Sequence, residues 1–134
     1  MTIKSSKTLV EEASKEIDTF SPEKVKELHE SNSCALIDIR DIRELENEGS
    51  VDGAIHVPRG MLEFWLDPSS SYFKNNKFSD QSKKIILFCA GGLRSALGAK
   101  SLKDMGYENV AHVQGGFASM RLSGFKLKKR IIKI

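Results

Sequence analysis

The stretch that decides the fold is Lys84-Ile85-Ile86-Leu87-Phe88-Cys89-Ala90-Gly91-Gly92-Leu93-Arg94-Ser95, an apolar run that ends on a cysteine and continues through two glycines. The apolar run is rich in β-branched and aromatic side chains, which is typical of a strand buried on both faces, as in a parallel sheet. Cys89 is therefore predicted at the carboxyl end of a strand. Open α/β sheets bind their ligands at that edge.

The two glycines after the cysteine predict an anion-binding loop. Gly91 and Gly92 tolerate the positive φ angles that turn consecutive backbone N–H groups toward one point, at the start of the next helix. Those N–H groups and the helix end would favour the thiolate form of Cys89, which is the reactive form. Our hypothesis is that Cys89 is a thiolate nucleophile. The alternative is a buried structural cysteine followed by a tight turn.

Strand and helix patterns alternate along the rest of the chain. Further short strands are predicted at 18–20, 34–39, 54–57 and 110–114, and helices at 8–17, from 22 onward, and at 44–48, 95–105 and 117–122. This alternation predicts an α/β fold. We divide the chain into a lead-in helix at 1–17, one α/β domain at 18–125 and a basic C-terminal tail at 126–134.

The composition is that of an ordinary globular protein, with 134 residues, of which 40% are hydrophobic and 29% charged. No apolar stretch approaches the about 20 residues of a membrane span, and the amino terminus lacks the apolar region of a signal peptide. Two cysteines make no disulfide framework. We therefore expect a cytoplasmic protein with no membrane partner.

Much of the positive charge lies in the tail. The basic residues there are Lys126, Lys128, Lys129, Arg130 and Lys133. Such a tail can bind nucleic acid, but its apolar residues alternate with the charges closely enough to pack on the domain. We favour packing, so no nucleic-acid partner is predicted.

Charged residues follow two other predicted strands. Asp38 and Arg40 end the strand at 34–39, and parallel strands would bring them to the same edge as Cys89. We interpret them as a structural ion pair, with direct catalysis as the alternative. Glu44 is expected to pair with a nearby arginine. Arg59, after the strand at 54–57, either steers a dianion toward the loop or is a surface arginine.

The remaining cysteine and two histidines are interpreted as structural. Cys34 starts its strand, about 16 Å from the active edge, which is too far for a disulfide to Cys89, so we expect a buried free thiol. His56 and His112 lie in strand-like runs and are expected to be hydrogen-bonded core residues. Neither has the spacing of metal ligands, and no cofactor is predicted.

Four segments resemble motifs of the single-domain rhodaneses, which are thiosulfate sulfurtransferases that carry a sulfane sulfur as a cysteine persulfide. In the order of the chain, which is also the order of the family, they are Leu36 to Arg40 with Glu44, Gly49 to Pro58, Cys89 to Ser95, and Val113 to Phe117. The chain departs from the family pattern at four positions, where Leu45, Ser50, Asp52 and Met120 replace an aromatic residue, histidine, proline and tryptophan. The resemblance implies a central, mostly parallel five-stranded sheet with helices on both faces.

The resemblance also implies a reaction: Cys89 takes sulfur from a donor such as thiosulfate and passes it to cyanide or to a small or protein thiol. Cys89 and Arg94 would be catalytic, and the residues that bind the sulfur would be Ala90, Gly91, Gly92, Leu93 and Ser95. One alternative is a non-catalytic rhodanese-like binding module. A cysteine phosphatase or arsenate reductase is less favoured, because those phosphatases have five residues between cysteine and arginine, and this chain has only Ala90 to Leu93.

Overall fold

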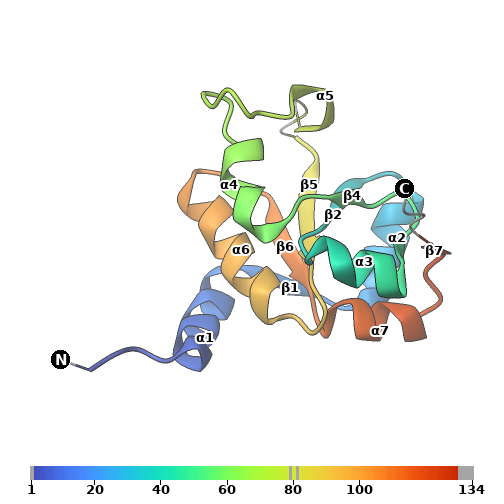
Figure 1. Ribbon diagram of the computed structural model, residues 1–134, viewed down its shortest axis with the longest axis horizontal. Coiled ribbons are helices and arrows are strands. Elements are labelled where there is room, and N and C mark those ends of the chain that lie inside the picture. Colours follow the sequence, from blue (N-terminus) through green and yellow to red (C-terminus); the bar gives the residue numbers. More distant parts are fainter. Residues whose placement is uncertain (1, 79, 81, 130–134) are drawn as a thin grey trace.

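The computed structural model describes residues 2–78, 80 and 82–129 (Figure 1). The elements are, in order, α1 (Ser6–Glu16), β1 (Asp18–Phe20), α2 (Pro22–Glu30), β2 (Cys34–Asp38), α3 (Ile42–Glu48), β3 (Ser50–Val51), β4 (Ile55–His56), a 3-10 turn (Arg59–Met61), α4 (Leu62–Trp65), α5 (Asn75–Phe78), β5 (Lys84–Phe88), α6 (Leu93–Asp104), β6 (Val110–Val113), α7 (Gly116–Leu122) and β7 (Leu127–Lys128).

The core of the protein is a five-stranded sheet with the order β1-β6-β5-β2-β4. Every pair of neighbouring strands in it is parallel, which confirms the predicted sheet. The apolar strand β5 lies in the middle, where a strand must be apolar on both faces. Cys89 follows directly and lies at the carboxyl edge of the sheet.

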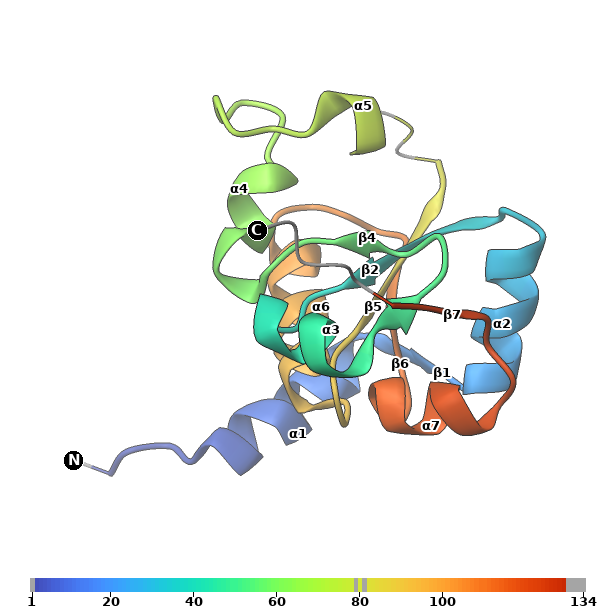
Figure 2. The ribbon, with the colours of Figure 1, turned by 45° about the vertical axis from the view of Figure 1, so that its right-hand side comes forward.

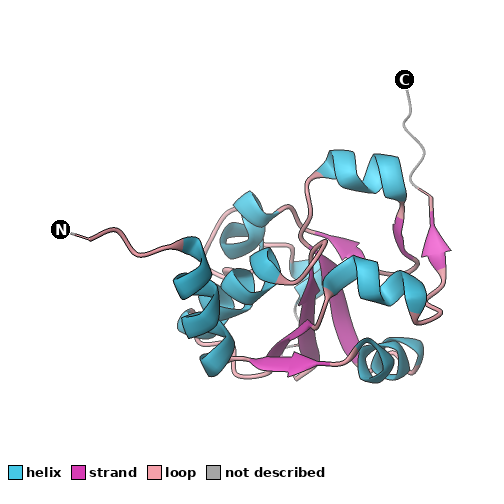
Figure 3. Cartoon of the chain, turned by 90° about the horizontal axis from the view of Figure 1, so that it is seen from below, coloured by secondary structure: helices cyan, strands magenta, loops and turns pink. Residues whose placement is uncertain are grey.

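Helices cover both faces of the sheet, as Figure 3 shows. Ile85, Leu87 and Cys89 point into one apolar core, which includes residues of α6. Ile86 and Phe88 point into the other, against α7. Alternation along β5 therefore sends Cys89 to the side of the sheet that α6 covers.

A second, two-stranded sheet joins β3 to β7 in antiparallel pairing and was not predicted. Figure 2 shows β7, in dark red, after the chain has left α7. Leu127 is 41% exposed, so backbone pairing rather than apolar burial holds this part of the tail. The predicted packing of 130–134 lies outside the described residues.

None of the described helices has the length and apolar character that crossing a membrane requires.

Candidate active site

The sulfur of Cys89 lies at the centre of the loop that joins β5 to α6. The backbone N–H of Gly92 donates to Sγ at 3.1 Å, and that of Ser95 donates at 3.3 Å. The Ser95 hydroxyl lies 3.5 Å from the same sulfur. Two backbone N–H donors thus converge on Sγ, and the Cys89 thiol donates to the Ser95 hydroxyl, in a residue that is only 1% exposed.

Other N–H groups of the loop have no acceptor among the residues that the structure describes. They include those of Gly91, Leu93 and Arg94. Leu93 and Arg94 open α6, and the first N–H groups of a helix have no partner within it. They carry the positive end of the helix dipole, which favours a bound anion. The loop can therefore offer further donors to a charged group beside Sγ.

The two loop glycines play different parts. Gly92 has φ 104°, in the left-handed region, and this conformation both caps α6 and aims its N–H at the sulfur. Gly91 is not among the residues with positive φ, and a Cβ added to it would meet open space. The prediction of positive φ was therefore right for Gly92 and wrong for Gly91, because one reversal of the backbone is enough to form the loop.

This difference predicts opposite outcomes for two alanine variants. Gly92→Ala should lower the free energy of unfolding by about 1–2 kcal/mol, because alanine resists the left-handed conformation, and it should slow alkylation of Cys89. Gly91→Ala should change the free energy of unfolding by less than about 0.5 kcal/mol. Urea denaturation and the rate of iodoacetamide labelling measure both effects. Equal behaviour of the two variants would contradict this account of the loop.

The start of α7 holds the loop through backbone hydrogen bonds. The N–H groups of Phe117 and Ala118 donate to the carbonyls of Cys89 and Ala90 at 2.8 and 3.2 Å. A Cβ on Gly116 would lie 2.5 Å from the Cys89 carbonyl oxygen. The glycine therefore allows α7 to approach the loop backbone at hydrogen-bonding distance.

Arg94 extends from the first turn of α6 to Glu44 in α3. Its two terminal nitrogens donate to the two carboxylate oxygens at 2.8 and 2.9 Å, which confirms that Glu44 pairs with an arginine. The hydrogen bond from Arg94 is the main cause that lowers the pKa of Glu44. The Arg94 side chain is 42% exposed, so the pair is screened by solvent and contributes modestly to stability. Its main effect is to fix the guanidinium beside the loop.

Asp38 and Arg40 form a fully buried ion pair, as the structural interpretation predicts. Arg40 Nη2 donates to Asp38 Oδ2 at 2.8 Å and to the Gly49 carbonyl at the same distance. Its guanidinium lies 4.0 Å from the centre of the Phe117 ring in α7. The Ser50 hydroxyl donates a further hydrogen bond to Asp38 Oδ2, at 2.6 Å. Ser50 occupies the position where the family pattern has histidine.

Arg59 follows β4, and its guanidinium donates to Glu63 at 2.8 Å. Glu63 lies one helical turn further along the chain and neutralises this cation. Steering of a dianion by Arg59 therefore stays a prediction. The ion pair with Glu63 would compete with the dianion for the Arg59 guanidinium.

Cys34 is a buried free thiol, as predicted. Burial raises its pKa to about 11, so it is protonated at neutral pH. Because only the thiolate reacts, we expect one equivalent of iodoacetamide to modify Cys89 and to spare Cys34 at pH 7 in the folded protein. Peptide mass spectrometry checks this. Labelling of Cys34 before Cys89 would contradict the assignment of Cys89 as the reactive thiol.

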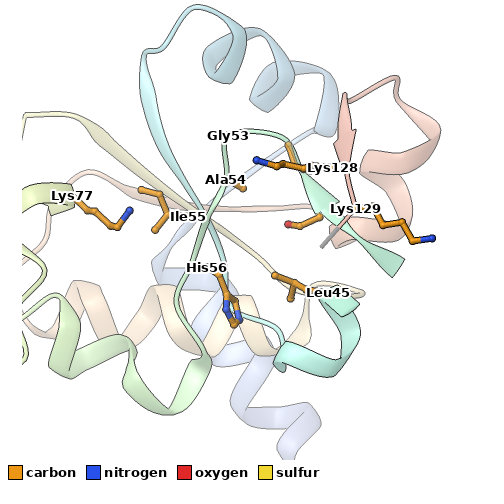
Figure 4. A pocket seen from close by; sticks show the side chains of 10 residues that line it. Leu45, Gly53, Ala54, Ile55, His56, Lys77, Lys128 and Lys129 are labelled. Carbon is orange, nitrogen blue, oxygen red and sulfur yellow. The ribbon is translucent and has the colours of Figure 1, made fainter. Parts of the chain in front are cut away.

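A hollow at the β4 segment is a separate feature. Its volume is about 550 Å³, and neither Cys89 nor any residue of its loop lines it. Figure 4 shows Lys77 on one side of the β4 segment and Lys128 and Lys129 on the other. The candidate site at Cys89 is therefore formed by the loop itself and does not include this cavity.

Sequence reasoning missed three contributions to the site. Gly116 was noted only as part of a motif and Ser50 only as a departure from a pattern. His112, whose Nδ1 lies 2.9 Å from Ser95 Oγ, was noted only as a core residue. A glycine that adjoins a predicted helix start is the one signal that pointed to close backbone contact. The partners of Ser50 and His112 lie far away in the sequence, and no local pattern identifies them.

Comparisons with known proteins agree with this geometry. A family model described as a rhodanese-like domain matches residues 21–122. A protein of unknown function from Rhodopseudomonas palustris CGA009, described as a possible tyrosine phosphatase, is 43% identical, with a TM-score of 0.88 over 96% of this chain and 98% of that one. The polysulfide-sulfur transferase of Wolinella succinogenes is 29% identical, with a TM-score of 0.72 over 92% and 87%.

Two curated relatives differ in how much of their length they share with the chain. A tRNA uridine(34) hydroxylase from Erwinia tasmaniensis is 30% identical over 83 residues, which are 62% of this chain but only 22% of that protein. A rhodanese domain-containing protein of Drosophila melanogaster is 32% identical over 98 residues, which are 71% of this chain and 88% of that protein. Together with the family model, this match shows that the chain belongs to the rhodanese-like domain family.

Proposed function

We propose that the protein transfers a sulfane sulfur from a donor such as thiosulfate to a thiophilic acceptor, cyanide or a thiol, through a persulfide on Cys89. The observation that carries the proposal is the convergence of the Gly92 and Ser95 N–H groups on Sγ. Donors fixed around a sulfur stabilise its negative charge without reorganising during the reaction. Membership in a family that includes sulfur transferases supports the same chemistry.

The reaction takes two displacement steps. The Cys89 thiolate attacks the outer sulfur of thiosulfate, an S–S bond forms on Sγ, and the bond to the sulfonate sulfur breaks, so that sulfite leaves with the electron pair. Cyanide or a thiolate then attacks the outer sulfur of the persulfide, and the Cys89 thiolate leaves. No oxidant or reductant is consumed beyond the donor and the acceptor.

The loop supplies what the intermediate needs. A persulfide carries negative charge one bond beyond Sγ, and the N–H groups of Gly91, Leu93 and Arg94 have no acceptor within the described part of the chain. They adjoin the two N–H groups that already serve Sγ. The Arg94 guanidinium is held at the same edge by Glu44. We expect these groups to receive the outer sulfur.

Intact-mass measurement tests the proposal directly. After incubation with thiosulfate, the protein should gain the mass of one sulfur atom, and cyanide should remove it with release of thiocyanate. Peptide mapping should place the added sulfur on Cys89. A protein that gains no sulfur from thiosulfate or polysulfide, with Cys89 reduced and accessible to iodoacetamide, would contradict the proposal.

A cysteine phosphatase or arsenate reductase is the second candidate, and the description of the Rhodopseudomonas palustris protein favours it. Two observations weigh against it. Only four residues separate Cys89 from Arg94. Both terminal nitrogens of Arg94 donate to Glu44, so fewer of its N–H groups are available for bidentate binding of phosphate. Hydrolysis of a phosphoester without sulfur uptake would favour this candidate.

The relatives named tRNA uridine(34) hydroxylase suggest a third possibility. Because the chain spans 22% of the length of the Erwinia protein, the likeness supports a shared domain, and the activity of the whole relative is a separate proposal. A non-catalytic binding module would also share the domain. Sulfur uptake by Cys89 separates the proposed transfer from a binding module, and an assay for uridine oxidation tests the third possibility.

A further inference from the structure

His112 is a buried histidine that the proposed reaction does not use directly. It lies in β6, is 5% exposed, and is flanked by two hydroxyl groups. Its Nδ1 lies 2.9 Å from Ser95 Oγ, and its Nε2 lies 3.0 Å from Thr19 Oγ1. Both ring nitrogens therefore have a hydrogen-bond partner, and one of these partners touches the sulfur of Cys89.

The sheet explains why these groups meet. His112 is the register partner of Thr19 in β1 and of Leu87 in β5. Partners in a parallel sheet point to the same face, and Cys89 lies two residues after Leu87, so it points there too. Ser95 enters this face from the first turn of α6 and is fully buried. A continuous chain of contacts then runs from Thr19 through His112 and Ser95 to Cys89.

The chemistry of the four groups fixes which group donates and which accepts in each hydrogen bond. Burial lowers the pKa of His112, so its ring is neutral and has one donor and one acceptor nitrogen. A thiolate only accepts, so the Ser95 hydroxyl must donate to it. That hydroxyl then accepts from Nδ1–H, and Nε2 accepts from Thr19. In the thiol state all three directions can reverse.

The reversal also balances protons. The thiol state of the chain holds one proton more than the thiolate state. Shifting each hydrogen by one position moves the proton of Cys89 to Ser95, that of Ser95 to Nδ1, and that of Nε2 to Thr19, which is exposed and releases its own proton to water. Cys89 is buried, so this chain connects its sulfur with solvent.

We propose that His112, anchored by Thr19, is a positioning residue that holds the Ser95 hydroxyl as a donor to the negatively charged sulfur of Cys89. The inference deepens the proposed sulfur transfer and rests on it for its biological role. Other charged groups at this edge include the Arg94–Glu44, Asp38–Arg40 and Arg59–Glu63 pairs, each of which combines opposite charges. Changing His112 leaves these pairs intact.

A double-mutant cycle on the resting protein tests the inference. The readout is the rate of iodoacetamide labelling of Cys89 as a function of pH. His112→Leu should slow labelling roughly threefold to tenfold below the midpoint of the profile. The reason is that the Ser95 hydroxyl loses the Nδ1–H group that orients it toward the sulfur. His112→Asn, which places an amide nitrogen near the position of Nδ1, should recover the rate to within about twofold. In a Ser95→Ala background, His112→Leu should have no further effect.

Two measurements guard against a merely structural effect. His29→Gln removes an imidazole that binds the Asp52 carbonyl, away from the loop, and should leave the labelling profile unchanged. The free energy of unfolding of each variant shows whether it is folded under the conditions of labelling. Wild-type labelling rates in His112→Leu, or additive effects of the His112 and Ser95 changes, would overturn the inference.

The tautomer of His112 gives an independent readout. Imidazole ¹⁵N chemical shifts of the wild-type protein, above the midpoint of the labelling profile, should show the proton on Nδ1. A proton on Nε2 under those conditions would overturn the inference. Neither measurement uses a sulfur donor, so failure of sulfur uptake with the predicted tautomer and labelling would refute the proposed function alone.

Discussion

Cys89→Ser should abolish sulfur uptake from thiosulfate and leave the fold nearly unchanged. Serine is almost the same size as cysteine, and the N–H groups of Gly92 and Ser95 can donate to its hydroxyl as they do to Sγ. A serine hydroxyl, however, neither ionises near neutral pH nor carries a sulfane sulfur. We expect the mass gain after incubation with thiosulfate to fall to background, while the melting temperature shifts by no more than a few degrees.

The matched control is Cys34→Ala. Cys34 lies in the apolar cluster on the other face of the sheet, and the loss of its sulfur should lower stability by about 1 kcal/mol without affecting sulfur uptake. Together the two variants separate a chemical role from a packing role for the two cysteines. Sulfur uptake by Cys89→Ser at the wild-type level would end the covalent mechanism.

Gly116→Ala should both destabilise the protein and inactivate it. The residue has φ 59°, and its added Cβ would lie 2.5 Å from the Cys89 oxygen and 2.8 Å from the carbonyl carbon and oxygen of Ala90. Backbone cannot move aside as a flexible side chain can. Left-handed strain and the collision together should lower the free energy of unfolding by about 2–5 kcal/mol. Urea denaturation measures this loss.

Two other glycines separate the causes. Gly106 has φ 110° and open space where a Cβ would lie, so Gly106→Ala reports conformational strain without collision. Gly60 also has open space and no positive φ, so Gly60→Ala should be nearly neutral. Any folded Gly116→Ala protein should also take up sulfur more slowly, because the loop carbonyls must shift. If it matched Gly106→Ala in stability and the wild type in activity, the proposed contact between α7 and the loop would be wrong.

The sequence by itself determined the type of fold and predicted which sulfur lies at the loop. The apolar run of β5, the alternation of strands with helices, and a cysteine followed by glycines at a strand end are local patterns, and each reflects burial or backbone freedom within a few residues. They were sufficient to predict the five strands, the parallel sheet, the loop around Cys89 and the buried thiol of Cys34. The short pairing of β3 with β7 escaped prediction, because two-residue strands carry almost no periodicity.

Only the tertiary structure decided which distant side chains hold the residues around the sulfur in place. Arg94 meets Glu44 from 50 positions away, and His112 meets Thr19 from 93 positions away. Such contacts depend on strand register and on the distance between a helix and a strand, and the sequence states neither. The same reason explains Gly116: its glycine is required by the carbonyl of Cys89, which lies close only after the sheet has formed and α7 has packed against it.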